Sequence, residues 1–347
     1  MKTAIESWLD DLLIAGGQWP AERAAVCSRP GSVGSRLFVH AITRLFRLKA
    51  GLQAPSWPFV FLRGVLLLLT SLLTPLSLSA ADRYGSHTAA EFAKHVREVK
   101  KKLPSDDFTI VVSPPFVVIG DDEPAEVRQR AKDTVQWAVE KLKAAYFNKD
   151  PKDILDIWLF RDKESYEGNA EKLFGSKPDT PYGYFSESDK ALVMNIDTGG
   201  GTLVHEIVHP FVAANFPDCP AWFNEGLGSL YEQSGERNGR IIGRTNWRLP
   251  GLQEAIRKER VPSFKTLCST TTEEFYEKDR GTNYAQARYL LYYLQQQGLL
   301  RKFYHRFYAN RKKDPTGYAT LQEILGRNDM AAFQRDWEAY VLKLRFR

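Results

Sequence analysis

The chain of 347 residues has few cysteines, three in all, and few histidines, six in all. No two cysteines have the CxxC spacing of a thiolate zinc site or a redox motif, which argues against both kinds of site. Cys219 and Cys268 are the cysteines that remain once the N-terminal segment described below is removed. In an exported protein two such cysteines either form one disulfide or stay as two buried thiols. We predict the disulfide.

Residues 82–347 also lack an excess of charge of either sign. They carry 40 Lys or Arg against 38 Asp or Glu, whereas the whole chain has a net charge of +6. Proteins that bind nucleic acid through its phosphates normally show a basic block or a basic and aromatic stripe, and neither is present in residues 82–347. We therefore expect no nucleic-acid partner. The 43% hydrophobic and 26% charged composition excludes a disordered or collagen-like chain.

One long apolar run stands out, over residues 58–79, and a basic, acid-poor flank precedes it. The part after Arg63 has about 13 apolar residues, which suits the core of a signal peptide and is short for a bilayer span. About forty residues precede the basic flank, more than a signal peptide needs, and a start codon assigned too far upstream would explain them. We predict that residues 1–81 are a leader cut near Ala81.

This prediction places the protein outside the cytoplasm, in a periplasm or in the extracellular space. The alternative is an uncleaved membrane anchor through residues 57–78, in which Arg63 would be costly within the bilayer. We expect contact with a membrane only in that alternative.

Residues 82–347 contain no Pro/Ser-rich linker, no repeat and no low-complexity tract, so we expect a single domain. Apolar periodicity predicts helices at 89–103, 123–146 and 163–174, strands at 108–113, 116–120 and 154–160, and a hairpin over 182–196. After Gly201 we expect no further strand, and helices at 202–214, 220–233, 282–298, 299–311, 317–326 and 329–345. A mixed sheet followed by helices is the α+β fold class.

The segment "TLVHEIVH", residues 202–209, joins the two halves and contains an HExxH motif. Residues four apart on a helix lie on one face, so His205 and His209 can direct their imidazoles at one ion. A catalytic zinc site has three protein ligands and a water molecule, whose pKa the metal lowers toward about 7. Glu206 lies beside the pair and is suited to accept the proton of that water.

A third ligand is available in the apolar segment "PAWFNEGLGSLYE", where Glu225 follows His209 after a short return loop. The metzincin pattern is excluded, because it requires glycine and histidine where this chain has Val212 and Asn215. The competing interpretation is a helix with two ordinary histidines and a solvated glutamate. Ionisable groups inside an apolar run are costly unless a metal or a partner satisfies them, which favours the metal site.

The motifs "TLVHEIVH" and "PAWFNEGL" resemble those of the gluzincin metallopeptidases, and within them the peptidase-MA-like families of largely uncharacterised bacterial proteins. With the flanking "YGYFSESDKALVMNI" and "TNYAQARYLLYYL", the resemblance covers about residues 108–300. It implies a zincin-like fold, in which a small twisted sheet lies over the active-site helix and an edge strand borders the cleft. It also implies one zinc ion per chain held by His205, His209 and Glu225, with Glu206 as general base and a peptide or protein as substrate.

Two residues depart from the pattern of that group. Pro210 follows the second histidine, so we expect the helix to kink or end there. In thermolysin-like gluzincins an aspartate four residues after the third ligand supports a histidine ligand, and this chain has Ser229 there, which is a weaker partner.

A peptidase also needs a donor to the tetrahedral oxyanion, for which Tyr284, Tyr231 and His305 are candidates. We select Tyr284 because it matches the tyrosine of the "Y-A-Q" stretch in the resembling families. The leading hypothesis is therefore an exported zinc metallopeptidase. The alternatives are a catalytically inactive zincin-fold protein of the cell envelope that binds zinc or a protein, and an envelope scaffold in which the motif is accidental.

Overall fold

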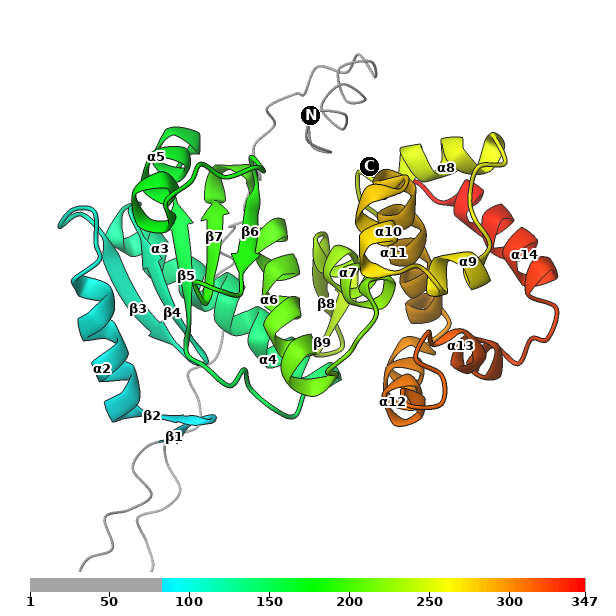
Figure 1. Cartoon of the computed structure of the whole chain (residues 1–347), viewed down its shortest axis with the longest axis horizontal. Helices are drawn as coiled ribbons and strands as arrows, with labels where there is room; N and C mark the ends of the chain where they lie inside the picture. Colours follow the sequence, from blue (N-terminus) through cyan, green and yellow to red (C-terminus); the bar gives the residue numbers. More distant parts are fainter. Residues whose placement is uncertain (1–82, 347) are drawn as a thin grey trace, which may run out of the picture. The chain divides into compact units, whose positions relative to one another are not determined.

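A five-stranded sheet and the helices around it form the first half of the computed structural model, which describes residues 83–346 (Figure 1). The predicted leader, its cleavage point and the alternative anchor at 57–78 lie outside these residues. The sheet order is β3-β4-β5-β7-β6. The strands are β3 (Thr109–Ser113), β4 (Phe116–Gly120), β5 (Leu155–Phe160), β6 (Gly183–Ser186) and β7 (Ala191–Asn195). A two-stranded ribbon of β1 (Arg83–Tyr84) and β2 (His87–Thr88) precedes it.

The three central strands β4, β5 and β7 run parallel, and the outer strands β3 and β6 pair with them antiparallel. All residues of β4, β5 and β7 are buried, which explains why these segments are apolar without alternation. The hairpin predicted over 182–196 is confirmed, and the register between β6 and β7 places its turn at residues 187–190. The fold is thus a mixed α+β fold with a small mixed sheet.

Helices cover both faces of this sheet. On one face lie α2 (Ala89–Lys100) and α5 (Lys163–Phe174), whose buried side chains pack against Trp158 and Phe160. On the other face lie α3 (Pro124–Arg130), the π-helical turn η1 (Ala131–Gln136), α4 (Trp137–Ala145) and α6 (Gly200–Asn215). The predicted helix over 123–146 is therefore present but contains one π-helical turn. A short 3-10 helix, η2 (Ile196–Thr198), leads from β7 into α6.

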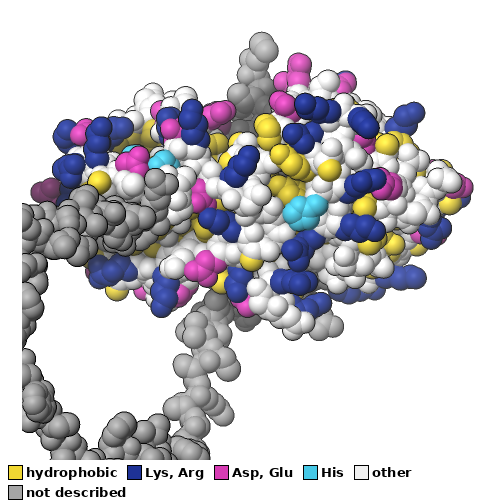
Figure 2. Space-filling model, turned by 90° about the horizontal axis from the view of Figure 1, so that it is seen from below, with side chains coloured by type: hydrophobic (Ala, Val, Ile, Leu, Met, Phe, Trp, Pro, Cys, Tyr) yellow, Lys and Arg dark blue, Asp and Glu magenta, His cyan; other side chains and the backbone are white. Residues whose placement is uncertain are grey.

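The second half of the described chain packs around α7 and α11, which contact one another. Its elements are α7 (Ala221–Tyr231), β8 (Ser234–Arg237), β9 (Arg240–Gly243), α8 (Leu249–Arg257), α9 (Phe264–Cys268), α10 (Thr272–Glu277), α11 (Arg280–Gln296), α12 (Leu300–Asn310), α13 (Tyr318–Leu325) and α14 (Met330–Lys343). On the face drawn in Figure 2, acidic and hydrophobic side chains are interspersed among the lysines and arginines. Within residues 83–346, no helix has both the length and the apolar character that crossing a membrane requires.

Two predictions about this half are wrong. Strands do not stop at Gly201, because β8 and β9 form a hairpin whose turn residues, Asn238 and Gly239, both have positive φ. Asn-Gly flanked by strand-like residues is the strongest short hairpin signal, so the sequence "ERNGRI" does indicate this hairpin. Helices α8, α9 and α10 also occupy residues 249–277, where none was expected. In the first half, the helix predicted at 202–214 is present as α6, which continues through Pro210 to Asn215 and so does not end at that proline.

The predicted disulfide is also wrong, since Cys219 and Cys268 are both free thiols. Cys268 is buried at the end of α9, and Cys219 lies in the loop before α7 with its Sγ 3.8 Å from the carbonyl oxygen of Pro220. Each thiol packs into the apolar core from a different element, and burial raises the pKa of both. The alternative of unpaired, packed thiols therefore describes the structure.

Candidate metal centre

Two ligand candidates come from consecutive turns of α6. His205 and His209 project from one face of this helix, with ring centroids 4.9 Å apart. The helix begins directly after Gly199, whose φ of +102° lets the chain turn out of η2. A Cβ on Gly201 would collide with the carbonyl oxygen of Glu232, so glycine lets the start of α6 approach the end of α7.

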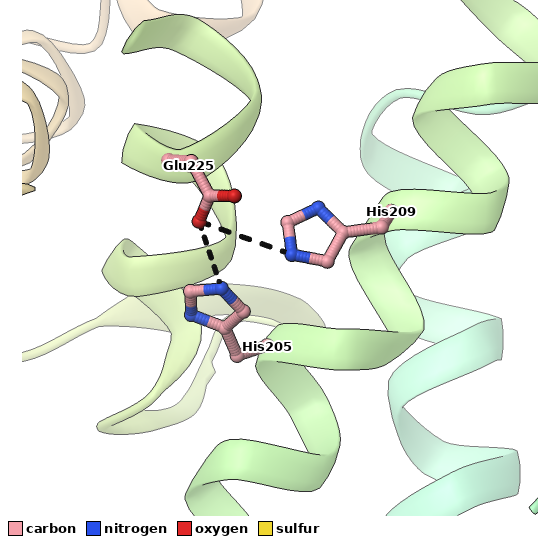
Figure 3. A group of neighbouring side chains, drawn as sticks. All are labelled: His205, His209 and Glu225. Atoms are coloured by element: carbon pink, nitrogen blue, oxygen red, sulfur yellow. Dashed lines mark hydrogen bonds and ion pairs between the residues drawn. The ribbon is translucent and has the colours of Figure 1, made fainter. Parts of the chain in front are cut away.

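Glu225 on α7 completes the cluster (Figure 3). Its Oε2 lies 3.1 Å from Nε2 of His205 and 3.9 Å from Nε2 of His209. One ligand atom from each of the three residues lies within 4.8 Å of the others. Zinc bonds of the usual lengths, arranged tetrahedrally, would separate ligand atoms by about 3.3 Å. Small movements of the side chains would therefore suffice to hold one ion.

The approach of α7 to α6 depends on glycine. A Cβ on Gly228 would lie 3.0 Å from Nε2 of His205, which is closer than side chains normally pack. On the other side of α7, a Cβ on Gly226 would lie 3.2 Å from Cβ of Ala287 on α11. The glycines of "NEGLG" thus let α7 lie close to its two neighbours while it presents Glu225 to the histidines.

His205 is oriented from behind by Glu232, which the sequence analysis did not select. Nδ1 of His205 lies 3.1 Å from Oε1 of Glu232. Arg248 donates from Nη2 to Oε1 (2.8 Å) and from Nε to Oε2 (3.1 Å) of this carboxylate, and Asn246 donates to Oε2 (3.0 Å). A carboxylate on the second nitrogen of a histidine fixes its tautomer and leaves Nε2 for a metal.

Ser229, the position from which support was expected, does not provide it. Its side chain is fully buried and its hydroxyl has no hydrogen-bond partner. Glu232 supports His205 instead. It lies about one helical turn after Ser229, directly after the last residue of α7. The signal in the sequence was its seven-residue spacing from Glu225, which places both carboxylates on one side of a helix.

His209 is oriented in a similar way by the residue before the third ligand. Its Nδ1 lies 3.0 Å from Oδ1 of Asn224, which can only accept a hydrogen bond. Nδ1 of His209 therefore carries the proton and Nε2 faces Glu225. Because Asn224 and Glu225 are neighbours on α7, one helix both orients a histidine and supplies a carboxylate.

Burial and charge set the protonation of the cluster. Burial lowers the pKa of His205, but its hydrogen bonds to Glu225 and Glu232 outweigh this effect and raise the pKa to about 10. Burial raises the pKa of Glu225, but His209 and His205 more than offset it and lower the pKa to about 2. The pKa of Glu232 is likewise held below its ordinary value, because Arg248 and His205 outweigh the effect of burial. Both carboxylates are thus ionised at neutral pH.

Glu206 lies beside the cluster and not within it. Its Oε2 is 3.8 Å from Nε2 of His209, and its side chain is 13% exposed. Burial raises the pKa of Glu206, with the nearby histidines acting in the opposite direction. A carboxylate whose pKa is raised holds a proton more readily than an ordinary carboxylate and can still return it.

Of the three candidate donors to an oxyanion, Tyr284 alone lies near the ligand cluster. The ring of Tyr284 lies 5.0 Å from the guanidinium of Arg248 and so is near the cluster. The hydroxyl of Tyr231 instead bonds that of Tyr146 in the core (2.7 Å), and His305 lies on the exposed side of α12 against Tyr304. The structure therefore does not bring Tyr231 and His305 to the cluster of His205, His209 and Glu225.

One tyrosine that the sequence analysis missed contacts a ligand directly. Tyr276 on α10 donates a hydrogen bond from its hydroxyl to Oε1 of Glu225, and its ring lies 6.3 Å from that of Tyr284. This bond leaves Oε2 of Glu225 directed at the histidines. The signal available was the capping box of Thr271 and Glu274, which marks the start of α10.

The sequence matches no protein-family model, and no curated protein is significantly similar to it.

Proposed function

We propose that this protein is an exported, zinc-dependent metallopeptidase with a zincin-like fold. The observation that carries the proposal is the convergence of two imidazole nitrogens and one carboxylate oxygen within 4.8 Å, with a fourth ionisable group, Glu206, beside them. Two histidines and one glutamate are a donor set that suits zinc and leaves one coordination position for substrate or water. The sheet, with β6 at its edge and α6 against its face, agrees with the fold that the motifs imply.

A zinc ion bound by His205, His209 and Glu225 would supply Lewis acidity, which polarises the scissile carbonyl and acidifies a water molecule. Glu206 accepts the proton of the attacking water and later delivers it to the departing amine. Its raised pKa suits this double task, since a carboxylate of ordinary acidity would hold the proton less well.

Other residues position the groups that react. Glu232 and Asn224 fix the two imidazoles, and Tyr276 fixes Glu225. Tyr284, beside Tyr276, is the proposed donor to the oxyanion, and its hydroxyl would stabilise negative charge as the carbonyl carbon becomes tetrahedral.

The test combines metal analysis of the purified protein with digestion of a broad peptide library. We expect about one zinc ion per chain and cleavage of peptide bonds. Glu206→Gln should keep the zinc and the fold but lose hydrolysis by about three orders of magnitude or more, because glutamine is nearly isosteric and cannot accept the proton.

Equal activity of wild type and Glu206→Gln would show that the hydrolysis is a contaminant or that the base is another residue. Absence of zinc after reconstitution would overturn the metal site itself. Zinc binding without cleavage of any peptide would favour the alternative, an inactive zincin-fold protein that binds zinc or a protein partner.

A further inference from the structure

Arg288 on α11 is a charged residue that is completely buried (0% exposed) and that the proposed mechanism does not use. Within residues 83–346 no carboxylate forms an ion pair with its guanidinium, and Nη1 has no hydrogen-bond partner. Burying a charge is costly unless hydrogen bonds replace its hydration, and an apolar side chain of similar volume is often no less stabilising. The stability of the core therefore does not by itself account for an arginine at this position.

The other donors of Arg288 are directed at backbone carbonyl groups of two segments. Nε donates to the carbonyl oxygen of Ser229 (2.9 Å) and Nη2 to that of Leu230 (3.4 Å), both in the last turn of α7. Nη2 also donates to the carbonyl oxygen of Arg244, which follows β9. Carbonyl groups at the C-terminus of a helix lack partners within the helix and carry partial negative charge, which a cation stabilises. Arg288 thus joins the end of α7 to the segment that follows the β8–β9 hairpin.

Both segments carry residues that support His205. Glu232 directly follows α7, and its Oε1 lies 3.1 Å from Nδ1 of His205. Asn246 and Arg248, which donate to Glu232, follow shortly after the second segment's carbonyl group that Nη2 binds. Because Arg288 is bonded to the backbone of both segments, it fixes the carboxylate of Glu232 relative to its donors.

Two further hydrogen bonds hold the same segments together. The backbone N–H of Arg244 donates to the carbonyl oxygen of Gln233 (2.7 Å), just after the end of α7. The backbone N–H of Asn246 donates to the hydroxyl of Tyr289 (3.0 Å), the residue that follows Arg288 on α11. One short stretch of α11 therefore holds both the carboxylate that supports His205 and the segment that supports this carboxylate.

We propose that Arg288 is a positioning residue of the metal centre. Its guanidinium holds the end of α7 and residues 244–248 at the separation that lets Glu232, paired with Arg248, accept a hydrogen bond from Nδ1 of His205. Arg288 thereby orients a zinc ligand through the backbone of two other segments. This inference rests on the zinc site of the proposed function, because His205 is one of its ligands, but it does not require that the protein cleaves peptides.

The first experiment measures zinc affinity by competition with a chelator, in the full chain, for wild type, Arg288→Met and Gln286→Met. Methionine keeps an unbranched buried side chain and removes the donors, so Arg288→Met should weaken zinc binding about tenfold. Gln286 is also fully buried on α11, and it donates to the carbonyl oxygen of Pro262 (2.6 Å), which lies outside both segments. Gln286→Met is therefore the matched control and should change zinc affinity less than about threefold. An equal loss in both variants would overturn the proposal.

A double-mutant cycle with Glu232→Ala tests whether Arg288 acts through Glu232. Once this carboxylate is absent, Arg288→Met should weaken zinc binding less than about threefold further, because the hydrogen bond that it supports is already lost. A further loss of about tenfold would show that the two residues act independently and would contradict the proposal. If Arg288→Met does not fold, Arg288→Lys replaces it, since lysine keeps the charge but cannot reach both segments from its single nitrogen.

Nuclear magnetic resonance of the metal-free protein separates this inference from the proposed function. The hydrogen bond to Glu232 should protect the Nδ1 proton of His205 from exchange with water, which gives a resonance that Glu232→Ala removes and thereby identifies. Loss of this resonance in a folded Arg288 variant, with its retention in Gln286→Met, would support the positioning role even if the protein binds no zinc and cleaves no peptide. An unchanged resonance in the Arg288 variant would overturn the role and leave the peptidase proposal intact.

Discussion

Nδ1 of His205 lies 3.1 Å from Oε1 of Glu232, and the same oxygen lies 2.8 Å from Nη2 of Arg248. The imidazole is therefore bonded to a carboxylate whose own position is fixed by a half-buried cation. Of the three proposed ligands, His205 is thus the one that is hydrogen-bonded to the Glu232–Arg248 ion pair, neither member of which is itself a proposed ligand.

Glu232→Gln should weaken zinc binding about 10- to 100-fold, because glutamine keeps the shape but not the charge that raises the basicity of His205. Competition with a chelator of known affinity measures the effect. Ser229→Ala is the matched control, since the hydroxyl of Ser229 bonds nothing, and its zinc affinity should equal that of wild type. Equal weakening by both substitutions would contradict the role of Glu232.

Tyr276→Phe and Tyr284→Phe should have different effects. The first removes the hydrogen bond to Oε1 of Glu225 and should lower zinc affinity, by about tenfold. The second leaves that bond in place, so zinc affinity should stay unchanged while kcat falls about a hundredfold, through loss of the oxyanion donor. Chelator competition and steady-state kinetics on both variants distinguish the roles. A fall in kcat for Tyr276→Phe alone would transfer the donor role to Tyr276.

Zinc binding should release protons. Because the pKa of His205 is raised from 6.5 to about 10, a zinc ion at pH 7 must displace its proton, and zinc affinity should increase as the pH rises toward 10. Calorimetry in two buffers of different ionisation enthalpy should show about one proton released per ion at pH 7. Zinc binding without proton uptake by the buffer would show that His205 is already neutral.

The raised pKa of His205 also predicts how the stability of the metal-free protein changes with pH. Protonated His205 is favoured in the folded state, since its pKa there exceeds the ordinary value of 6.5. This contribution to stability is complete below pH 6.5 and is lost as the pH rises through about 10. Denaturant unfolding of metal-free protein between pH 6 and 10 should therefore show a declining free energy of unfolding, and zinc should diminish the decline.

Gly228→Ala should impair the metal site, because its methyl group would lie 3.0 Å from Nε2 of His205, the atom proposed to bind zinc. We expect at least a tenfold loss of zinc affinity and a loss of stability of about 1–3 kcal/mol. Gly251→Ala on α8 is the control, since a Cβ there meets no atom within 4 Å and should stabilise the fold by about 0.5–1 kcal/mol. Unchanged zinc affinity in Gly228→Ala would show that α7 can move aside without cost.

The ligand cluster could be predicted from the sequence because its geometry is local. His205 and His209 are one helical turn apart, so their spacing alone places them on one face, and Glu225 follows on the next helix after a short return loop. The strands β4, β5 and β7 were equally clear, since buried parallel strands are continuous apolar runs.

Two of the supporting residues, Arg248 and Tyr276, could not be predicted, because no local pattern connects them to the ligands. Arg248 reaches Glu232 only after the β8–β9 hairpin has returned the chain to α7, and this hairpin was overlooked. Tyr276 reaches Glu225 from a short helix in a segment without apolar periodicity. The disulfide was mispredicted since sequence gives the number of cysteines but not the elements that bury them.

Residues 246–276 contain none of the proposed ligands, yet they include Asn246, Arg248 and Tyr276, which bond Glu232 or Glu225. A bound ion stabilises every conformation in which these bonds are intact and leaves locally opened conformations without that gain. Backbone amides of α8 and α10 should therefore exchange with deuterated solvent more slowly when zinc is present. Protection from exchange would extend along the chain well beyond the helices that hold the ion.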